Sequence, residues 1–337
     1  MMAAPVGFAT GYEAAVGVRG MAEDVRRAED RGYDVGFFSE TNNLMRDGVS
    51  AMAAMALATR RMTLGFTQIV RLRSPVVMAQ SAATLDELTG GRIVLCAGAC
   101  TRGQAVHHGL PELDPPRALA EWVEAIRLLL TGDAVTYAGE VVRLNGVRLG
   151  WTPVRRRVPI WIAAMSPTGL RLAGRIGDGV LLNAVSSPEY TANAVAILRE
   201  AVRAAGRSWD DFEVAQIVNC SVEDGHEAAI DAIRWEVASK FHPGKPSSQI
   251  GPRTRVGEPH IHEEDLPLLR EAYERGGLEG VTRAFPASWI EGLTASGTPD
   301  EVVRRVARYR EAGVTLPILR PAARRQAARL IELFAPQ

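Results

Sequence analysis

The chain has 337 residues with 39 basic and 39 acidic side chains, so its formal net charge is zero. This balance supplies no electrostatic reason to bind nucleic acid or an anionic membrane, and we expect neither partner. No apolar run reaches the length of a membrane span, and the first residues lack the features of a secretion signal, so a cytoplasmic protein is expected. The length allows one large α/β barrel or two smaller domains.

Short apolar runs alternate with amphipathic segments of helical period along the chain. The predicted strands are 6–10, 35–39, 62–67, 92–97, 159–164, 179–183, 212–220 and 314–319. The predicted helices are 18–32, 50–60, 76–88, 116–130, 167–176, 188–206, 225–240 and 298–313. Eight strands with helical crossovers favour a closed (β/α)8 TIM barrel. The competing open doubly wound sheet lacks its glycine-rich fingerprint after the first strand.

Two segments interrupt the repeat, and we assign the whole chain, 1–337, to a single barrel domain that carries both. Residues 134–150 contain Gly139 and the turn pair Asn145–Gly146, which predict a hairpin-like excursion. Residues 241–289 are rich in proline and glycine and then helical from about 263 to 275. A structureless loop of that length is unusual, so we interpret this segment as an insertion over the C-terminal mouth of the barrel.

Metal-ligating residues are sparse in this sequence. Cys96 and Cys100 lie four residues apart without a second pair, and together with Cys220 they make an odd number. Small buried thiols explain them better than a metal site or a disulfide framework. The "HIH" at 260–262 is similar to the paired histidines of metal-dependent barrel hydrolases, but it falls in the insertion and not at the end of the first strand. No metal is predicted, although a metallohydrolase stays a minor alternative.

Two loops at predicted strand ends could receive a ligand. The loop "AGACTRGQ" (97–104) is built of small residues, and a flat ring could lie against its backbone. Ser166 is placed to cap the helix that begins at about Pro167, and the N–H groups of its first turn could bind a phosphate or carboxylate. Close packing and ordinary helix capping explain either loop by itself. Together, on adjacent strands, they fit a ligand with a planar head and a phosphorylated tail.

The motifs that surround these loops resemble those of the bacterial luciferase-like superfamily of flavin- and deazaflavin-dependent oxidoreductases. The most specific are "AATLDELTGGR", within 79–100, and "LAGRIGDGVLLN", within 158–190. The stretches "NNLMRD" and "LLNAVSSPEY" are most similar to the methylenetetrahydromethanopterin reductases and other coenzyme F420-dependent reductases.

That resemblance implies a (β/α)8 barrel, commonly a homodimer, which binds a deazaflavin or a flavin at its C-terminal mouth. It implies a non-prolyl cis peptide bond near Thr67–Gln68 that supports the ring. By position in the motifs, the cofactor-binding residues would be Thr67, Gln68, Gly98, Ala99, Met165, Ser166, Thr168, Gly169, Leu170, Asn183 and Ala184.

Three residues are candidates for chemistry on the substrate: Glu40, Thr41 and His107. Glu40 would donate a proton or stabilise charge; the alternative is a supporting carboxylate that caps a helix or pairs with an arginine. For His107 the alternative is a surface histidine. Arg320 would neutralise an anionic tail, or else be a solvated arginine.

The resulting hypothesis is an F420-dependent oxidoreductase that transfers hydride between reduced deazaflavin and a small organic substrate. The alternatives are an FMN-dependent two-component monooxygenase and a cofactor-free member of the family. A separate reductase would regenerate the reduced cofactor. Methylenetetrahydropterin reductases carry a glutamate in the first strand, whereas Ala9 and Thr10 stand there in this chain, which argues against a pterin substrate.

Overall fold

Eight parallel strands close into a barrel in the computed structural model, which describes residues 4–10, 13–40, 46–243 and 250–336. Strand β9 pairs with β8 on one side and with β11 on the other, and β11 pairs with β1, so the sheet has no open end. The predicted (β/α)8 barrel is therefore confirmed, and the open doubly wound sheet is excluded. The strands are β1 (Gly7–Thr10), β2 (Val35–Ser39), β3 (Thr63–Ile69), β4 (Ile93–Gly98), β7 (Ile160–Ala164), β8 (Gly179–Leu182), β9 (Glu213–Val222) and β11 (Leu316–Pro321).

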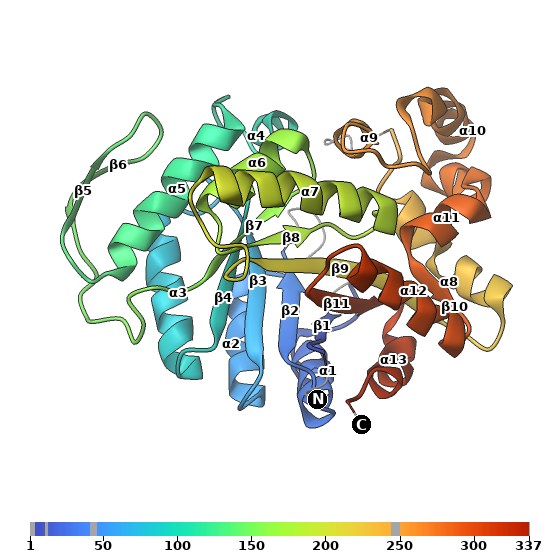
Figure 1. Cartoon of the computed structure of the whole chain (residues 1–337), viewed down its shortest axis with the longest axis horizontal. Coiled ribbons are helices and arrows are strands. Elements are labelled where there is room, and N and C mark those ends of the chain that lie inside the picture. The colour runs from blue at the N-terminus through green and yellow to red at the C-terminus, as the bar shows by residue number, and fades with distance from the viewer. Residues whose placement is uncertain (1–3, 11–12, 41–45, 244–249, 337) are drawn as a thin grey trace.

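Helices surround the barrel, as Figure 1 shows. Several begin with a serine N-cap followed by proline at the first helical position, as at Ser74, Ser166 and Ser187, which is the arrangement that satisfies and pre-orders a first turn. The helices that follow the strands are α1 (Val18–Asp30), α2 (Gly48–Ala58), α3 (Pro75–Thr89), α5 (Pro115–Leu130), α6 (Pro167–Ile176), α7 (Pro188–Ala204), α8 (His226–Ala238) and α13 (Ala327–Leu333), with α12 (Pro299–Glu311) before β11.

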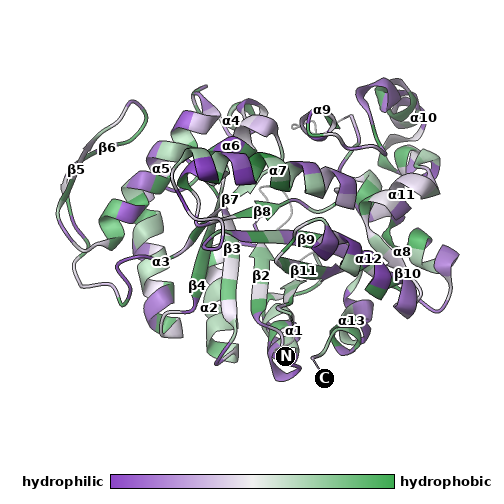
Figure 2. Ribbon diagram, in the orientation of Figure 1, coloured by the Kyte–Doolittle hydropathy of each residue, from purple (hydrophilic) through white to green (hydrophobic). Residues whose placement is uncertain are grey.

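Alternate residues of each strand face opposite sides, and this divides the core in two. Residues such as Phe37 and Trp161 fill the barrel interior, where their rings stack with centroids 6.4 Å apart. Their strand neighbours pack outward against the helices. Figure 2 shows hydrophobic residues concentrated on the strands and hydrophilic ones on the outward faces of the helices. All three cysteines are free and buried, and burial raises the pKa of Cys96.

The two interruptions of the repeat take different forms. Residues of the first excursion form the antiparallel hairpin of β5 (Val135–Ala138) and β6 (Arg143–Val147), next to α5 in Figure 1. A short helix, α4 (Arg102–His107), precedes α5.

The second interruption is more helical than the sequence predicted. It contains α9 (Ile250–Thr254), a 3-10 turn at Glu263–Asp265, α10 (Leu266–Ala284) and α11 (Ala287–Leu293), followed by the short strand β10 (Ala295–Gly297). The helix expected to end near 275 is interrupted there by non-helical backbone at Gly276 and Gly277, and a second helical segment continues to Ala284. These helices share an apolar core with α8, because each presents one apolar side to it.

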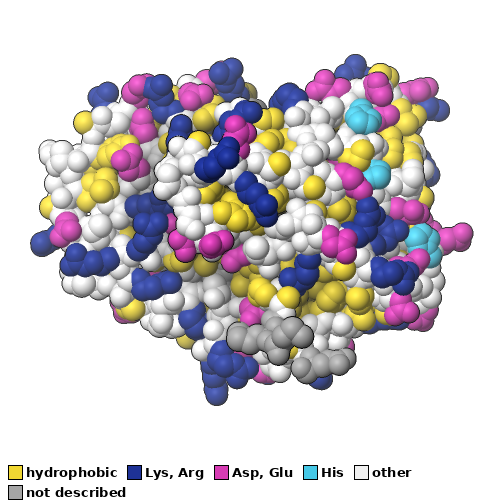
Figure 3. All heavy atoms as spheres, viewed as in Figure 1, with side chains coloured by type: hydrophobic (Ala, Val, Ile, Leu, Met, Phe, Trp, Pro, Cys, Tyr) yellow, Lys and Arg dark blue, Asp and Glu magenta, His cyan; other side chains and the backbone are white. Residues whose placement is uncertain are grey.

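The surface carries interspersed charges of both signs on the face shown in Figure 3. Among the helices of the described ranges, none combines the length and the apolar character needed to cross a membrane. Within the same ranges, no three His, Cys, Asp or Glu side chains lie close enough together to hold a metal ion.

Candidate active site

A cavity of about 410 Å³ opens among the C-terminal ends of β2, β3, β4, β7 and β8. This is the end of the barrel at which enzymes of this fold place their active sites, and the volume is in the range of small-molecule sites. Most of the lining is apolar, with a few polar side chains. The lining residues are Ser39, Glu40, Thr67, Ile69, Gly98, Ala99, Thr101, Gln104, Pro115, Pro116, Leu119, Ala163, Ala164, Met165, Ser166, Thr168, Gly169, Leu172, Leu181, Asn183, Ile217 and Pro252.

One wall of the cavity is bare backbone, because Gly98, Ala99 and Ala163 have little or no side chain. A Cβ atom added at Gly98 would lie 3.7 Å from the carbonyl oxygen of Gln68 and 3.8 Å from the Cβ of Ala163. These are ordinary contact distances, so neither protein packing nor backbone strain demands glycine there. The missing side chain leaves room on the cavity side, and a planar group could rest against this wall.

The N-terminus of α6 also borders the cavity. Ser166 caps the helix: its Oγ accepts a hydrogen bond from the Gly169 amide at 3.2 Å, and its carbonyl accepts one from the Leu170 amide at 2.8 Å. Of the first-turn amides expected to face a ligand, those of Gly169 and Leu170 therefore already donate within the helix. The Thr168 amide and the Ser166 hydroxyl proton are the groups best placed to donate to an anion, with the partial positive charge of the helix end behind them.

Four of the predicted site residues lie elsewhere. Gln68, Leu170 and Ala184 are buried behind the cavity wall, and His107 is exposed at the end of α4, where its ring contacts that of His108. Thr41 lies outside the described residues. The other nine predicted positions line the cavity.

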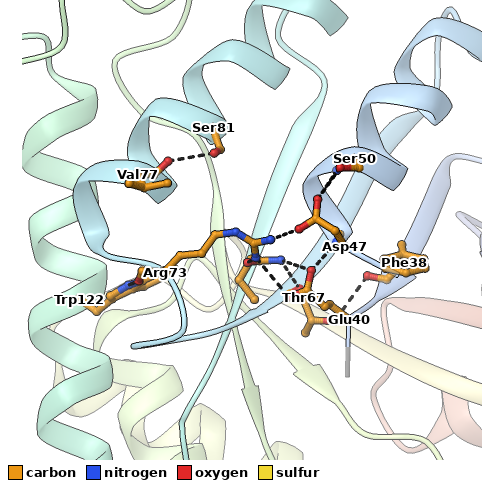
Figure 4. A network of polar contacts seen from close by, with 11 residues as sticks. Phe38, Glu40, Asp47, Ser50, Thr67, Arg73, Val77, Ser81 and Trp122 are labelled. Atoms are coloured by element: carbon orange, nitrogen blue, oxygen red, sulfur yellow. Dashed lines mark hydrogen bonds and ion pairs between the residues drawn. The ribbon is translucent and has the colours of Figure 1, made fainter. Parts of the chain in front are cut away.

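Glu40 is held by several donors at once, as Figure 4 shows. Its Oε2 accepts hydrogen bonds from the Gly48 amide at the start of α2 and from Gln68 Nε2 at 3.0 Å. Its Oε1 lies 3.2 Å from Nη1 of Arg73, whose other nitrogen contacts Asp47. The carboxylate thus caps a helix and pairs with an arginine, as its alternative interpretation expected, while it also faces the cavity.

The cis peptide bond expected near Thr67–Gln68 is absent: no peptide bond in the described part of the chain is cis. Strand β3 stays extended through Ile69, and Thr67 and Gln68 pair in register with Cys96 and Ala97 of β4. An unbroken ladder of this kind is satisfied by ordinary extended trans backbone. The irregularity comes later, at Arg71, which has φ of 75°.

Arg320 was expected to neutralise an anionic tail, but the structure gives its charge a partner within the chain. It is buried at the end of β11 in an ion pair with Glu236 of α8, and Glu236 also lies 2.9 Å from Lys240, whose pKa burial lowers to about 8. Asn219 lies beside Arg320 on β9 and is 1% exposed, and neither atom of its amide has a hydrogen-bond partner among the residues that the structure describes. The sequence did not single out Asn219.

The loop after β8 is strained at Val185, which has φ of 54°. A branched residue in this left-handed region is a clear outlier, and such a conformation costs about 1–3 kcal/mol. Arg253 of α9 lies against this loop and is 0% exposed. Burial lowers the pKa of Arg253, and the nearby Tyr190 and Glu258 oppose that change. Nothing in the sequence marked Arg253. The insertion was expected over the mouth of the barrel, but which of its residues reaches this loop is decided by tertiary packing.

Comparisons with known proteins agree with this geometry. The family model described as luciferase-like monooxygenase matches residues 1–316. The chain is 34% identical over 298 residues to a 5,10-methylenetetrahydromethanopterin reductase of Archaeoglobus fulgidus, covering 86% of each protein. It is 31% identical over 326 residues to an F420-dependent glucose-6-phosphate dehydrogenase of Nakamurella multipartita, covering 92% of this chain and 88% of that one. The crystal structure of the F420-dependent tetrahydromethanopterin reductase of Methanopyrus kandleri superposes with a TM-score of 0.85 at 26% identity over 98% of both chains.

Proposed function

The chain belongs to the luciferase-like monooxygenase family, and we propose that it is an F420-dependent oxidoreductase acting on a small organic substrate. Its relatives are oxidoreductases, and two that match most of its length are named as a methylenetetrahydromethanopterin reductase and an F420-dependent glucose-6-phosphate dehydrogenase. The observation that carries the proposal is the cavity itself, which joins a bare wall on β4 to a helix N-terminus on α6.

The residues present fit a deazaflavin with an anionic tail. Gly98, Ala99 and Ala163 leave one face of the cavity open to a flat ring, and Thr67 and Ile69 of β3 face the same space. The Thr168 amide and the Ser166 hydroxyl would hold the phosphate side of the tail. When bound, F420 accepts or donates hydride at the ring carbon that replaces the flavin N5.

The protein would contribute orientation and electrostatics to that transfer. Glu40 supplies a fixed negative charge at the cavity wall, because Gly48, Gln68 and Arg73 hold its carboxylate in one place. A carboxylate fixed in this way can orient a substrate hydroxyl by accepting its hydrogen bond at Oε1. His107 is too exposed, and too far along α4 from the lining, to be our choice for this role.

The substrate is proposed only as a small organic molecule. Ala9 is buried in the barrel interior, where the pterin reductases are expected to carry a carboxylate, so we do not propose a pterin. Substrate selection is assigned to the insertion, since its Pro252 reaches the cavity.

A titration of the purified protein with F420 and, separately, with FMN tests the proposal. Quenching or a shift of deazaflavin fluorescence at micromolar concentration, with FMN binding much more weakly, is the expected result. Tight FMN binding with F420 ignored would replace our proposal by the second candidate, an FMN-dependent two-component monooxygenase fed by a separate reductase. The family model favours that candidate by its description. Binding of neither would leave the cofactor-free alternative.

We also propose a homodimer. Helix α2 is apolar or small around its whole circumference, and Leu57 on its outer side is 77% exposed. Burial of this face against a second copy would remove apolar surface from water. Sedimentation of the purified protein at micromolar concentration tests this.

A further inference from the structure

The strained loop after β8 is anchored on both sides of Val185. Before it, the carbonyl oxygen of Ala184 accepts a hydrogen bond of 3.0 Å from Arg253 Nη2. After it, the Ser186 hydroxyl accepts one of 3.1 Å from Arg253 Nε, and the Ser186 carbonyl accepts one of 3.0 Å from the Tyr309 hydroxyl. A left-handed branched residue persists only where its surroundings impose it, and these bonds are what imposes it here.

The insertion supplies a second anchor beside Arg253. The carboxylate of Glu258 accepts a hydrogen bond of 2.9 Å from the amide of Ser187, the residue whose hydroxyl caps α7. Glu258 is 1% exposed. Arg253 and Glu258 of the insertion therefore both end on the same four-residue loop, 184–187.

Arg253 also reaches the loop after β7. Its Nη1 lies 3.7 Å from the sulfur of Met165, and the carbonyl of Met165 accepts a hydrogen bond of 3.0 Å from Tyr190. Met165 and Asn183 line the cavity beside the N-terminus of α6. The guanidinium thus connects the two loops that form the anion-binding end of the cavity, while the residue before it, Pro252, touches the cavity itself.

We infer that Arg253 is a positioning residue, which holds the loop after β8 in its strained form so that Asn183 and Met165 stay in place for the anionic tail of the cofactor. This inference rests on the proposed function, since it concerns the same cavity. Arg253 is not among the residues that line the cavity, and its Nε and Nη2 donate to Ser186 and Ala184, so its inferred role is exerted through the loop. The insertion, usually the part that varies in enzymes of this architecture, would then control cofactor affinity in this chain.

Amide hydrogen exchange, measured without any cofactor, tests whether Arg253 holds the loop after β8. In Arg253→Met, the amides of Ser187 and Tyr190 are expected to exchange at least about tenfold faster, because their anchors loosen with the loop. Arg207→Met is the matched control, since Arg207 also donates to two backbone carbonyls, those of Gly174 and Gly177, but at the other end of α6. That control is expected to leave exchange at 183–191 unchanged. Unchanged exchange in Arg253→Met would overturn the inference.

A double-mutant cycle, with F420 affinity as the measurement, tests whether the hold of Arg253 on the loop affects cofactor binding. Arg253→Met is expected to weaken F420 binding about tenfold or more, and Val185→Gly in that background to recover at least about threefold, because glycine adopts positive φ without an anchor. Arg253→Lys keeps the charge but not the planar fork, and it is expected to weaken binding at least about threefold. It also serves as the test variant if Arg253→Met does not melt cooperatively.

The outcomes separate the possible causes. A positioning role would be overturned if Arg253→Lys bound F420 with wild-type affinity while Arg253→Met lost affinity that Val185→Gly did not recover. In that case only the charge of residue 253 would matter. If the wild-type protein binds neither F420 nor FMN, the proposed function fails, whereas the exchange experiment still decides whether Arg253 holds the loop.

Discussion

Alanine at Gly98 is the most direct perturbation of the bare wall. The backbone of Gly98 is outside the left-handed region, and an added Cβ meets nothing closer than 3.7 Å, so the fold should accept it. Exchange of glycine for alanine at a compatible position stabilises a protein by about 0.4–1 kcal/mol. Gly98→Ala is therefore expected to melt at the wild-type temperature or slightly above it.

The same methyl group should interfere with a ring that rests on this wall. Carbon atoms in contact lie about 3.5–4.0 Å apart, and the new Cα–Cβ bond occupies about 1.5 Å of that separation. The ring must withdraw by roughly that amount, and overpacking of this kind costs about 1–3 kcal/mol. This corresponds to a loss of affinity of about 5- to 150-fold.

Fluorescence titration with F420 and differential scanning calorimetry on the same preparation measure both effects. Gly150→Ala is the matched control, since a Cβ at Gly150 meets nothing within 4 Å and the residue is not among those that line the cavity. Wild-type F420 affinity in a correctly folded Gly98→Ala protein would refute the reasoning, because the ring would then not lean on this backbone.

Three further predictions concern polar groups. Glu40→Gln removes the charge that faces Arg73 and should lower the free energy of unfolding, measured by urea denaturation, by about 1–3 kcal/mol. Asn219→Leu removes a buried amide that has no partner in the described part of the chain, and it should leave the free energy of unfolding unchanged or raise it by about 1 kcal/mol. Hydrogen bonds to Glu291 and Glu301 raise the pKa of His226, so its stabilisation is present below the unfolded pKa of about 6.5 and lost as pH rises through the folded value. The melting temperature should therefore fall from pH 6 to pH 8 more in the wild type than in His226→Gln.

Each of these has a result that contradicts it. Equal unfolding free energies of wild type and Glu40→Gln would show that the ion pair is not formed in solution. Thr191→Val breaks a hydrogen-bonded pair with Gln216 and serves as the reference. If Asn219→Leu lost as much stability as Thr191→Val, the Asn219 amide would have to be hydrogen-bonded. Parallel pH profiles for wild type and His226→Gln would remove the histidine as the source of the dependence.

Local patterns were sufficient for the strands and helices of the barrel. The predicted strand 35–39 is β2 to the residue, and the predicted helix 167–176 is α6. Period-two and period-3.6 burial, with serine caps followed by proline, act over a few residues and can be recognised in the sequence. Closure was also predictable, since eight crossover units leave few other arrangements. The helix end predicted near 275 coincides with non-helical backbone at Gly276 and Gly277, and what the sequence did not predict is the second helical segment that follows to Ala284.

In the candidate site, too, features of contiguous sequence could be predicted, whereas contacts between distant elements could not. The small residues of the 97–104 loop and the Ser166 cap are features of contiguous sequence, and both lie on the cavity. The partners of Glu40, the ion pair of Arg320 with Glu236 and the hold of Arg253 on Ala184 join residues from different elements.

The order of strands, helices and bare loops was thus determined by the sequence itself, because short-range periodicity and capping act between residues close along the chain. Which charges are neutralised within the fold, and which segment of the insertion reaches the barrel, was decided only by the tertiary structure. Such contacts join residues that are far apart in the sequence, and they depend on how whole helices and strands pack, which no local pattern specifies.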